Sequence, residues 1–255
     1  FKLTHNDRIS TVETAAGRRH VRPPMRVLLA FDKFKDSLTA PAACVIAARA
    51  LAERHSDWQL DLCPLADGGE GFCDILTRAA GGEIETHTVT GPRGAPVAAT
   101  IGLVLLARIP PAARALLAIG SRNPAAGISE SRLAVIEMAS ASGLALLAPD
   151  RRDPWHTTTL GTGELLRAAT RPGVAAIVLG VGGSATSDLG LGALAAHGFE
   201  FRSATGGLVT PPTPARWEQI TRLAGGVAPG LPPIRIACDV TNPLLGPRGA
   251  AAVYG

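Results

Sequence analysis

The sequence has few of the residues that mark several large protein classes. Aromatic residues make up only 4% of its 255 positions, so a folded core must be built from alanine, leucine, valine and isoleucine. The four cysteines, Cys44, Cys63, Cys73 and Cys238, form no C-x-x-C pair. This spacing argues against a metal site or a disulfide framework and favours small buried thiols in a reducing compartment. No apolar run is long enough to span a membrane, so we expect a cytoplasmic protein without membrane contacts.

Charge is also sparse and is not concentrated in any part of the chain. Charged residues make up 18% of the sequence, and the formal net charge of +4 comes from scattered arginines without a basic stripe interleaved with aromatics. We therefore predict no nucleic-acid binding. The hydrophobic content of 46% predicts a globular chain, and the length suffices for one large domain or two ordinary ones.

The most informative stretch is VAAIVLGVGGSATSDLGLGALAAHG at residues 174–198. It opens with a short, β-branched apolar run, which is typical of a strand buried on both faces. Glycines and hydroxyl residues follow, and a helical pattern begins near Leu191. A strand, a glycine-rich turn and a helix in this order direct backbone N–H groups toward an anion. The residues predicted to contact phosphate are Gly182, Gly183, Ser184 and Thr186.

Two better-known phosphate motifs are absent from this stretch. The sequence contains no G-x-x-x-x-G-K-[ST] loop, and the G-x-G-x-x-G pattern fails because Ala185 stands where its third glycine would be. A tight connection between strand and helix, with a capping residue at the helix start, explains the spacing equally well.

Lysine is the scarcest of the common charged residues, and its placement is uneven. Only three of the 25 basic residues are lysines, and two of them, Lys33 and Lys35, follow an apolar run at residues 25–31. A compact ammonium group acts as a point charge on phosphate, so Lys35 and the nearby Ser37 are candidate ligand contacts. The same residues also fit a solvated turn in which Ser37 or Thr39 caps the following helix.

A second strand-to-helix junction is rich in glycine and acid. An apolar run at residues 60–65 ends in ADGGEG at 66–71. Asp67 is a candidate ligand for Mg²⁺ or a proton acceptor, and Glu70 a candidate support for either role. The alternative is a plain turn around Gly68 and Gly69, with Glu70 in the first turn of a helix.

The rest of the pattern alternates strands and helices. Strands are predicted at residues 25–31, 60–65, 83–89, 95–106, 133–138, 174–179 and 234–240, with a hairpin at 199–209. The strand at 234–240 is predicted to be buried. Helices are predicted at 39–54, from 72 to the glycines at 81–82, from the threonines at 157–159 onward, near 191, and at 217–223. Residues 107–132 have no clear period, and residues 210–214 form a proline-rich connector.

Six blocks of the sequence, in order, resemble the type I family of bacterial glycerate kinases. They are DKFKDSLTA at 32–40, PLADGGEG at 64–71, AVIEMASASGLALL at 134–147, RDPWHTTTLGTGELL at 152–166, GVGGSATSDLGLG at 180–192 and ACDVTNPLLGPRGAAAVYG at 237–255. The resemblance implies ATP-dependent phosphorylation of D-glycerate, with 2-phosphoglycerate favoured over 3-phosphoglycerate as the product. ATP with Mg²⁺ and D-glycerate are the implied ligands, and the oligomeric state stays open.

The same resemblance implies an α/β fold with a Rossmann-like three-layer domain plus an inserted second α/β domain, and an active site in the cleft between them. Residues 25–80 and 236–255 correspond to the Rossmann-like domain and residues 81–235 to the inserted domain. Residues 1–24 are polar and end in two prolines, so we expect them to form a disordered tail. The family continues beyond residue 255. We therefore expect a fragment in which the Rossmann-like domain is incomplete.

Phosphoryl transfer needs alignment and charge neutralisation more than covalent chemistry from the protein. We hypothesise that Lys35 neutralises a phosphate or the glycerate carboxylate, and that Asp67 or Asp239 binds Mg²⁺ together with phosphate oxygens. Asp188 or Asp239 takes the proton of the attacking hydroxyl, and the sequence leaves this assignment open. Further substrate and phosphate contacts are assigned to Ser37, Gly68, Gly69, Glu70 and Asn242.

Some positions depart from the family pattern. The family usually has a small residue at Lys33, glycine at Asp36, asparagine at Ser187 and glycine at Leu189, and residues 107–132 are longer than the connection expected there. Two other functions therefore stay open. One is a catalytically inactive ligand-binding remnant of this fold, and the other is a different α/β protein that binds a phosphorylated ligand.

Overall fold

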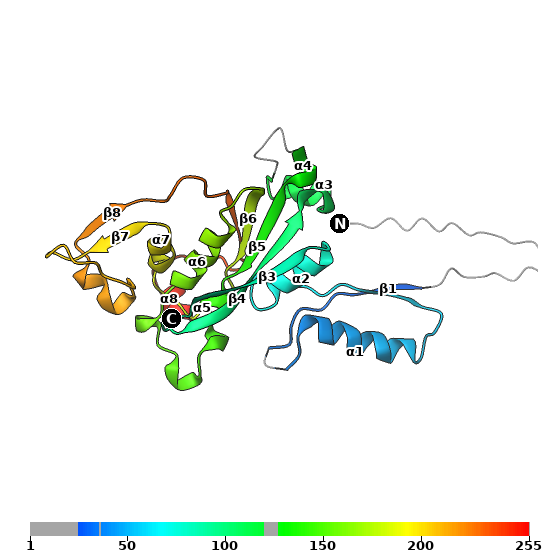
Figure 1. The fold of residues 1–255 in the computed structure, drawn as a ribbon. Helices are drawn as coiled ribbons and strands as arrows, with labels where there is room; N and C mark the ends of the chain where they lie inside the picture. Colours follow the sequence, from blue (N-terminus) through cyan, green and yellow to red (C-terminus); the bar gives the residue numbers. More distant parts are fainter. Residues whose placement is uncertain (1–24, 36, 120–126, 255) are drawn as a thin grey trace, which may run out of the picture. The chain divides into compact units, whose positions relative to one another are not determined.

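The computed structural model describes residues 25–35, 37–119 and 127–254. The predicted tail at 1–24 and Asp36 lie outside these residues. The chain divides into two compact units, residues 1–65 and 66–255, and each unit is described by itself. Both combine strands with helices (Figure 1), so the predicted α/β class is confirmed, whereas the predicted domain boundaries stay a prediction.

The N-terminal unit is a β-α-β arrangement. Strands β1 (Arg26–Leu29) and β2 (Gln59–Leu62) pair in parallel, and helix α1 (Ala40–Ala52) connects them. The helix begins where the sequence predicts, because the Thr39 hydroxyl accepts a hydrogen bond from the amide of Ala42 at 3.4 Å and a proline occupies the first turn. All three elements of this unit were predictable from the sequence.

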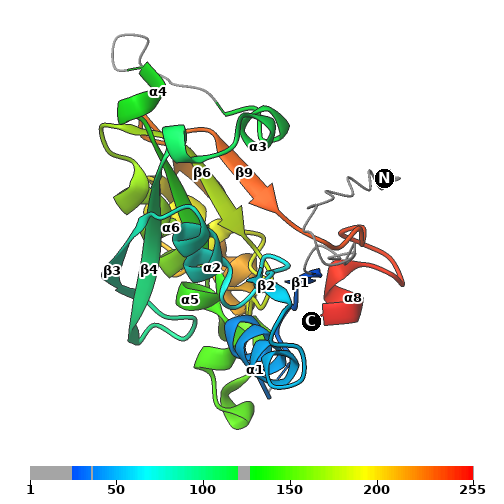
Figure 2. The same ribbon diagram turned by 90° about the vertical axis from the view of Figure 1, so that its right-hand side faces the viewer.

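The second unit is built on a five-stranded sheet in the order β3-β4-β5-β6-β9 (Figure 2). Its strands are β3 (Glu83–Thr90), β4 (Pro96–Leu105), β5 (Arg132–Glu137), β6 (Val174–Gly180) and β9 (Ile234–Ala237). The pairs β3–β4 and β4–β5 are antiparallel, whereas β5–β6 and β6–β9 are parallel. The carboxyl ends of β5, β6 and β9 therefore lie at one edge of the sheet, which is where open α/β sheets bind ligands.

Helices cover both faces of this sheet, as the alternation along β5 shows. Leu133 and Val135 pack in one core with Phe72 of α2 (Phe72–Ala79), and Ala134 and Ile136 pack in the other with Leu165 of α6 (Leu160–Ala169). Strand β6 is buried along its whole length. A strand enclosed on both sides must be apolar throughout, so the sequence pattern at 174–179 was diagnostic.

Shorter elements complete the second unit. They are η1 (Leu106–Arg108), α3 (Pro111–Leu116), α4 (Gly127–Glu130), α5 (Ala139–Ser142), η2 (Leu144–Leu146), η3 (Pro149–Arg151), η4 (Pro154–His156), α7 (Leu191–Ala196), β7 (Phe199–Arg202), η5 (Pro214–Gln219), β8 (Arg222–Gly225) and α8 (Ala250–Tyr254). No structure was predicted for the segment at 107–132. Its described residues include the short helices α3 and α4.

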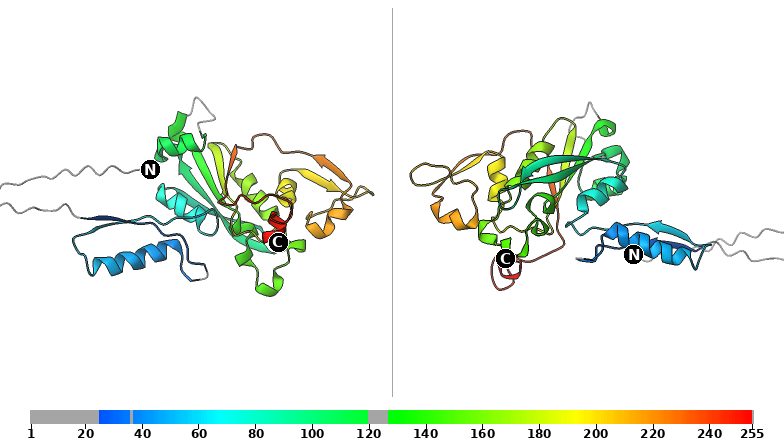
Figure 3. Two further views of the ribbon diagram at one scale, coloured as in Figure 1. Left: turned by 180° about the vertical axis from the view of Figure 1, so that it is seen from behind. Right: turned by 60° about the horizontal axis from the view of Figure 1, so that its bottom comes forward.

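Three predictions from the sequence need correction. The regular partner of β7 is β8. The predicted 199–209 hairpin is reduced to a bridge between Arg202 and Leu208, with backbone hydrogen bonds on either side of it. The predicted helix at 217–223 is the end of the 3₁₀ helix η5 followed by β8. Strands β7 and β8 lie beyond α7, away from the main sheet (Figures 1 and 3).

The third correction concerns β9, which was predicted to be buried. It forms the edge of the five-stranded sheet, and Ile236 is 65% exposed. An apolar sequence alone does not distinguish an edge strand from a central one, because either kind of strand can consist of apolar residues. The distinction depends on which strands pair with it.

Candidate functional site

Two glycine-rich turns meet at the carboxyl edge of the parallel strands. One turn, residues 67–71, leads into α2, and the other, residues 181–184, leaves β6. The amide of Gly182 donates to the carbonyl of Gly68 at 3.0 Å, and the amide of Val181 donates to the carbonyl of Ala237, at the end of β9, at 3.3 Å. The structure thus brings together the turns that the sequence analysis selected separately.

Glycine is required at this junction because the two backbones lie in direct contact. A Cβ atom on Gly68 would lie 2.8 Å from the carbonyl oxygen of Ala237, and one on Gly182 would lie 2.8 Å from the nitrogen of Gly69. Gly183 has φ +71°, and a Cβ there would lie 2.5 Å from Oε1 of Glu70. The glycines therefore serve the packing of one turn on the other, in addition to any approach of a phosphate.

The donors left on the second turn are fewer than the sequence implied. The amide of Gly182 is used by Gly68. The amide of Thr186 donates to Oγ of Ser184 at 3.0 Å, and the two hydroxyls of these residues lie 2.7 Å apart. No hydrogen bond within the described residues occupies the amides of Gly183 and Ser184. These two amides are the backbone donors that the turn can offer to an anion.

The predicted acidic residues other than Asp188 lie on the first turn and after β9, and Asn242 lies in the C-terminal segment. Asp67 is exposed, and its Oδ1 accepts the amide of Gly69 at 2.9 Å, which fixes the first turn. Glu70 and Asp239 are also exposed, and Asp239 follows the end of β9 by two residues. Asn242 donates from Nδ2 to the carbonyl of Arg248 and accepts from the Tyr254 hydroxyl, both at 3.1 Å. Both polar atoms of the Asn242 amide are therefore engaged within the C-terminal segment.

Asp188 is the most enclosed of the predicted site residues, at 1% exposure. Its Oδ2 accepts the amide and hydroxyl of Thr159 at 2.8 and 2.9 Å and the amide of Gly192 at 3.1 Å. Its Oδ1 accepts the amide of Gly190 at 3.1 Å. Donors from the protein thus occupy both carboxylate oxygens, so neither oxygen is left to contact a substrate hydroxyl. The geometry supports the alternative noted above, that of a capping residue.

The threonines at 157–159 belong to the same network. The hydroxyl of Thr157 donates to the carbonyl of Ala185 at 2.8 Å, and that of Thr159 accepts the amide of Ala193 at 2.9 Å while it donates to Asp188. All three threonines are buried. This cluster joins the start of α6 to the turn after β6 and to α7, so its hydroxyls are occupied within the protein.

One acidic residue at this edge was not selected from the sequence. Glu137 ends β5 and is 8% exposed, and its Oε2 accepts the amide of Cys73 at 3.2 Å. Burial raises the pKa of the Glu137 carboxyl, although the nearby amides of α2 act in the opposite direction. The available signal was an acid at the end of an apolar run, because a charged residue there has to find a buried partner.

Lys35 and Ser37 belong to the N-terminal unit. The Ser37 hydroxyl donates to the carbonyl of Lys35 at 3.5 Å, and the amide of Ser37 donates to the carbonyl of Phe34 at 2.9 Å. These contacts make a compact turn between β1 and α1. Their predicted role beside the glycine turns of the second unit stays a prediction.

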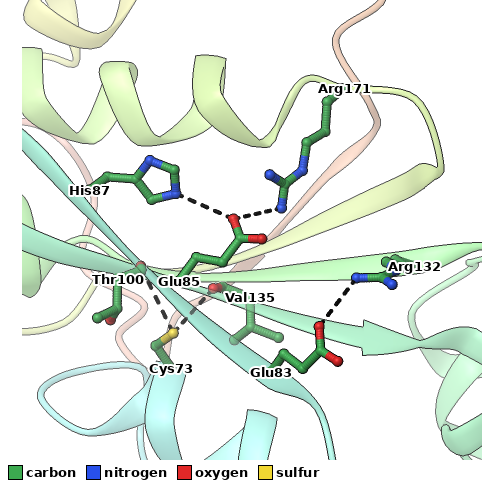
Figure 4. Close-up of polar contacts among 8 residues, drawn as sticks. All are labelled: Cys73, Glu83, Glu85, His87, Thr100, Arg132, Val135 and Arg171. Carbon is green, nitrogen blue, oxygen red and sulfur yellow. Dashed lines mark hydrogen bonds and ion pairs between the residues drawn. The ribbon is translucent and has the colours of Figure 1, made fainter.

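The opposite edge of the sheet carries ion pairs (Figure 4). Oε2 of Glu85 lies 2.8 Å from Nη2 of Arg171 and 3.5 Å from Nε2 of His87, and Glu83 lies 3.6 Å from Arg132. A hollow of about 580 Å³ lies beside these pairs, lined by residues of β3 and α6 such as Thr88 and Arg167. None of the predicted site residues lines it, so the candidate site is the strand edge and not this hollow.

The burial of the cysteines agrees in part with the sequence analysis. All four cysteines are free; Cys44 and Cys73 are buried as predicted, whereas Cys238 is exposed. Burial raises the pKa of the Cys73 thiol, which contacts the carbonyls of Thr100 and Val135 (Figure 4). Among the residues described, no cluster of three or more His, Cys, Asp or Glu is placed to hold a metal ion. No helix in the described ranges has the length and apolarity to cross a membrane.

Comparison with known proteins gives a consistent result. Residues 27–255 match the sequence profile of the Glycerate kinase family. The chain is 37% identical over 233 residues to glycerate kinase of Bacillus subtilis strain 168 and 34% identical over 237 residues to glycerate 2-kinase of Escherichia coli K12. Each alignment covers 91% of this chain and 55% of the relative.

A solved structure shows the same likeness. The crystal structure provisionally assigned to glycerate kinase 2 of Salmonella typhimurium LT2 superposes with a TM-score of 0.64 at 36% identity, covering 91% of this chain and 56% of the other. The chain thus spans about half the length of the relatives it matches. The profile match over nearly the whole described sequence establishes that the chain belongs to the glycerate kinase family.

Proposed function

We propose that the protein phosphorylates D-glycerate with ATP, and that the 2-hydroxyl is the acceptor. The observation that carries the proposal is the family match over residues 27–255, together with the meeting of two glycine turns at the carboxyl edge of parallel strands. The Escherichia coli relative named glycerate 2-kinase supports the choice of hydroxyl. An accessible acid-and-glycine edge of this kind suits a phosphorylated nucleotide.

The residues at the carboxyl edge of the sheet fit the phosphates of ATP and a Mg²⁺ ion. The amides of Gly183 and Ser184 offer donors for phosphate oxygens. Asp67 and Asp239 are exposed carboxylates, and one or two carboxylates suffice for Mg²⁺, which keeps several waters and binds the substrate phosphates. When bound, the ion neutralises charge on the transferred phosphoryl group.

The chain's own residues divide the remaining work. Lys35 neutralises a phosphate or the carboxylate of glycerate, and Ser37 donates a hydrogen bond nearby. Gly68 and Gly69 keep the first turn against the second, and Glu70 and Asn242 border the substrate. Of the two candidates for proton acceptor, Asp239 is favoured, because it is exposed, whereas Asp188 is buried and both its oxygens accept hydrogen bonds from the protein.

A direct assay tests the proposal. The full-length protein is mixed with ATP, Mg²⁺ and D-glycerate, ADP release is followed by coupled oxidation of NADH, and ³¹P NMR identifies the product. We expect turnover with D-glycerate and 2-phosphoglycerate as product. Release of ADP only with another acceptor, or no release at all, contradicts the proposal. In that event thermal shifts with ATP–Mg²⁺ and with phosphorylated sugars identify a binding protein, because a ligand of the native state raises Tm.

A variant at the N-terminal unit tests the predicted cation. Lys35→Ala is expected to raise KM or lower kcat at least tenfold in the active protein, because the charge next to phosphate is lost. Arg26→Ala is a matched control: Arg26 is a cation of the same unit that pairs with Asp61 on its surface, and its kinetics should match the wild type. Kinetics of Lys35→Ala equal to those of this control would remove Lys35 from the site.

A further inference from the structure

Glu137 is a buried acid at the candidate site that has no role in the chemistry proposed above. It is the last residue of β5, and 8% of it is exposed. Burying a carboxylate costs free energy unless its oxygens accept hydrogen bonds. The hydrogen-bond donors around the Glu137 carboxylate therefore indicate its structural role.

Its partner is the beginning of α2. The residue before that helix is Gly71, with φ +91°. It has no side chain that could accept the backbone amides of the first helical turn of α2. Such amides normally need a capping acceptor, and a negative charge there also suits the helix dipole. Oε2 of Glu137 accepts the amide of Cys73 at 3.2 Å. A residue of the central sheet thus supplies the cap that the local sequence lacks.

Other contacts fix the helix start and the strand end to each other. The Cys73 thiol donates to the carbonyl of Val135 on β5 at 3.3 Å, and the Ser140 hydroxyl donates to the carbonyl of Glu137 at 2.8 Å. Phe72 is 4% exposed and packs on Gly180, where an added Cβ would lie 2.8 Å from its ring. These contacts fix the position of the start of helix α2 at the carboxyl ends of β5 and β6.

The position of helix α2 also determines the position of the glycine turn that precedes it. Residues 67–71 directly precede α2, and Gly68 at their centre accepts the amide of Gly182. The acid of this turn, Glu70, is the charged group whose repulsion acts on Glu137, and it borders Gly183. The position of the first turn against the second thus depends on where α2 begins.

We propose that Glu137 is a positioning residue that holds the start of α2 on the strand edge and so sets the glycine turn 67–71 against the turn 181–184. Its action on activity rests on the proposed function, whereas its action on the turn does not. It touches neither reacting group. Its loss should act through the geometry of Gly68 and its neighbours.

The test compares two variants with matched controls. Glu137→Ala removes the acceptor, and Glu137→Gln keeps an acceptor but removes the charge. Glu164 offers the control, because it also accepts a backbone amide, that of Thr90 at 2.7 Å, from a different part of the sheet. Glu164→Ala therefore removes a comparable bond away from the glycine turns, and Glu164→Gln keeps its acceptor without the charge.

Amide hydrogen exchange gives a readout that does not need activity. In the full-length protein we expect residues 68–73 to exchange at least tenfold faster in Glu137→Ala and about twofold faster in Glu137→Gln, because a bond to a neutral acceptor is weaker. The Glu164 variants should leave this segment as in the wild type. Equal exchange of residues 68–73 in the Glu137 and Glu164 variants overturns the proposal. If Glu137→Ala does not fold, the two glutamine variants decide.

Kinetics then separate this proposal from the proposed function. We expect Glu137→Gln to raise KM for ATP with a smaller change in kcat, while Glu164→Gln changes neither. An active wild type with identical kinetics in both glutamine variants contradicts the effect of Glu137 on the site. An inactive wild type contradicts the proposed function alone, and the exchange comparison still decides the role of Glu137.

Discussion

The amide of Gly182 donates to the carbonyl of Gly68 at 3.0 Å, so a direct backbone hydrogen bond joins two glycine turns that are far apart in the sequence. The backbones can approach this closely because neither residue carries a Cβ atom. The contact explains why both turns are rich in glycine. It also makes the shape of each turn dependent on the other.

Gly182→Ala tests this dependence. The new methyl group would lie 2.8 Å from the nitrogen of Gly69, so we expect the free energy of unfolding to fall by about 1–3 kcal/mol and any kinase activity to fall at least tenfold. Gly226→Ala is the control, because no atom lies within 4 Å of an added Cβ there. Urea unfolding and kinetics are measured on both variants. Equal stability of the two would contradict the packing argument.

Asp188 can be tested as a structural residue. In Asp188→Asn an amide group replaces one oxygen of a carboxylate that accepts from Thr159, Gly190 and Gly192, so donors face a donor. We expect the free energy of unfolding to fall by about 1–3 kcal/mol, measured by urea unfolding at neutral pH. Full stability combined with a large loss of kcat would restore Asp188 as the proton acceptor.

Asp239→Asn is expected to behave in the opposite way. Asp239 is exposed, so its replacement by asparagine should leave the unfolding transition unchanged. If it accepts the proton of the glycerate hydroxyl, kcat falls by about 100-fold or more. A kcat within threefold of the wild type would exclude Asp239 as the base.

The sequence predicted the elements that local patterns control. Strand β6 could be found because burial on both faces demands continuous apolar sequence, and α1 because Thr39 caps it. The pairing of β7 with β8 could not be found, since the partners are separated by a long connection and the shorter hairpin at 199–209 has a plausible turn. Pairing between distant strands is decided by tertiary packing.

The candidate site shows the same limit. The glycine turns were recognisable one at a time, but their contact was not, because Gly68 and Gly182 meet only once the sheet has formed. The acidic residues Asp188 and Glu137 show this limit. Asp188 was predicted to act on the substrate, but its oxygens accept hydrogen bonds from the protein. Glu137 was not selected from the sequence, although it caps α2. Burial and partners, which separate these roles, are properties of the fold.

His197 should make stability depend on pH. The pKa of this imidazole is lowered, chiefly by burial and secondly by Arg167, and its buried Nε2 has no hydrogen-bond partner within the described residues. The unfolded chain, with a pKa of about 6.5, therefore binds the proton more tightly than the folded one. Stability is complete above that value and falls as pH drops toward the folded pKa. His197→Leu should reduce the loss between pH 7.5 and 5, measured by urea unfolding, and an unchanged slope would contradict this.

Leu189 occupies a conformation that suits glycine. Its φ is 55°, and the side chain is 59% exposed, so it gains little from burial to offset the strain of about 1 kcal/mol or more. Leu189→Gly is therefore expected to raise the free energy of unfolding, by up to about 1 kcal/mol after the entropy cost of glycine. Leu194→Gly in helix α7 is the contrast and should lower it by about 1 kcal/mol or more. Thermal unfolding of both variants measures the difference, and a loss of stability in Leu189→Gly as large as in Leu194→Gly would show that the backbone at 189 is not strained.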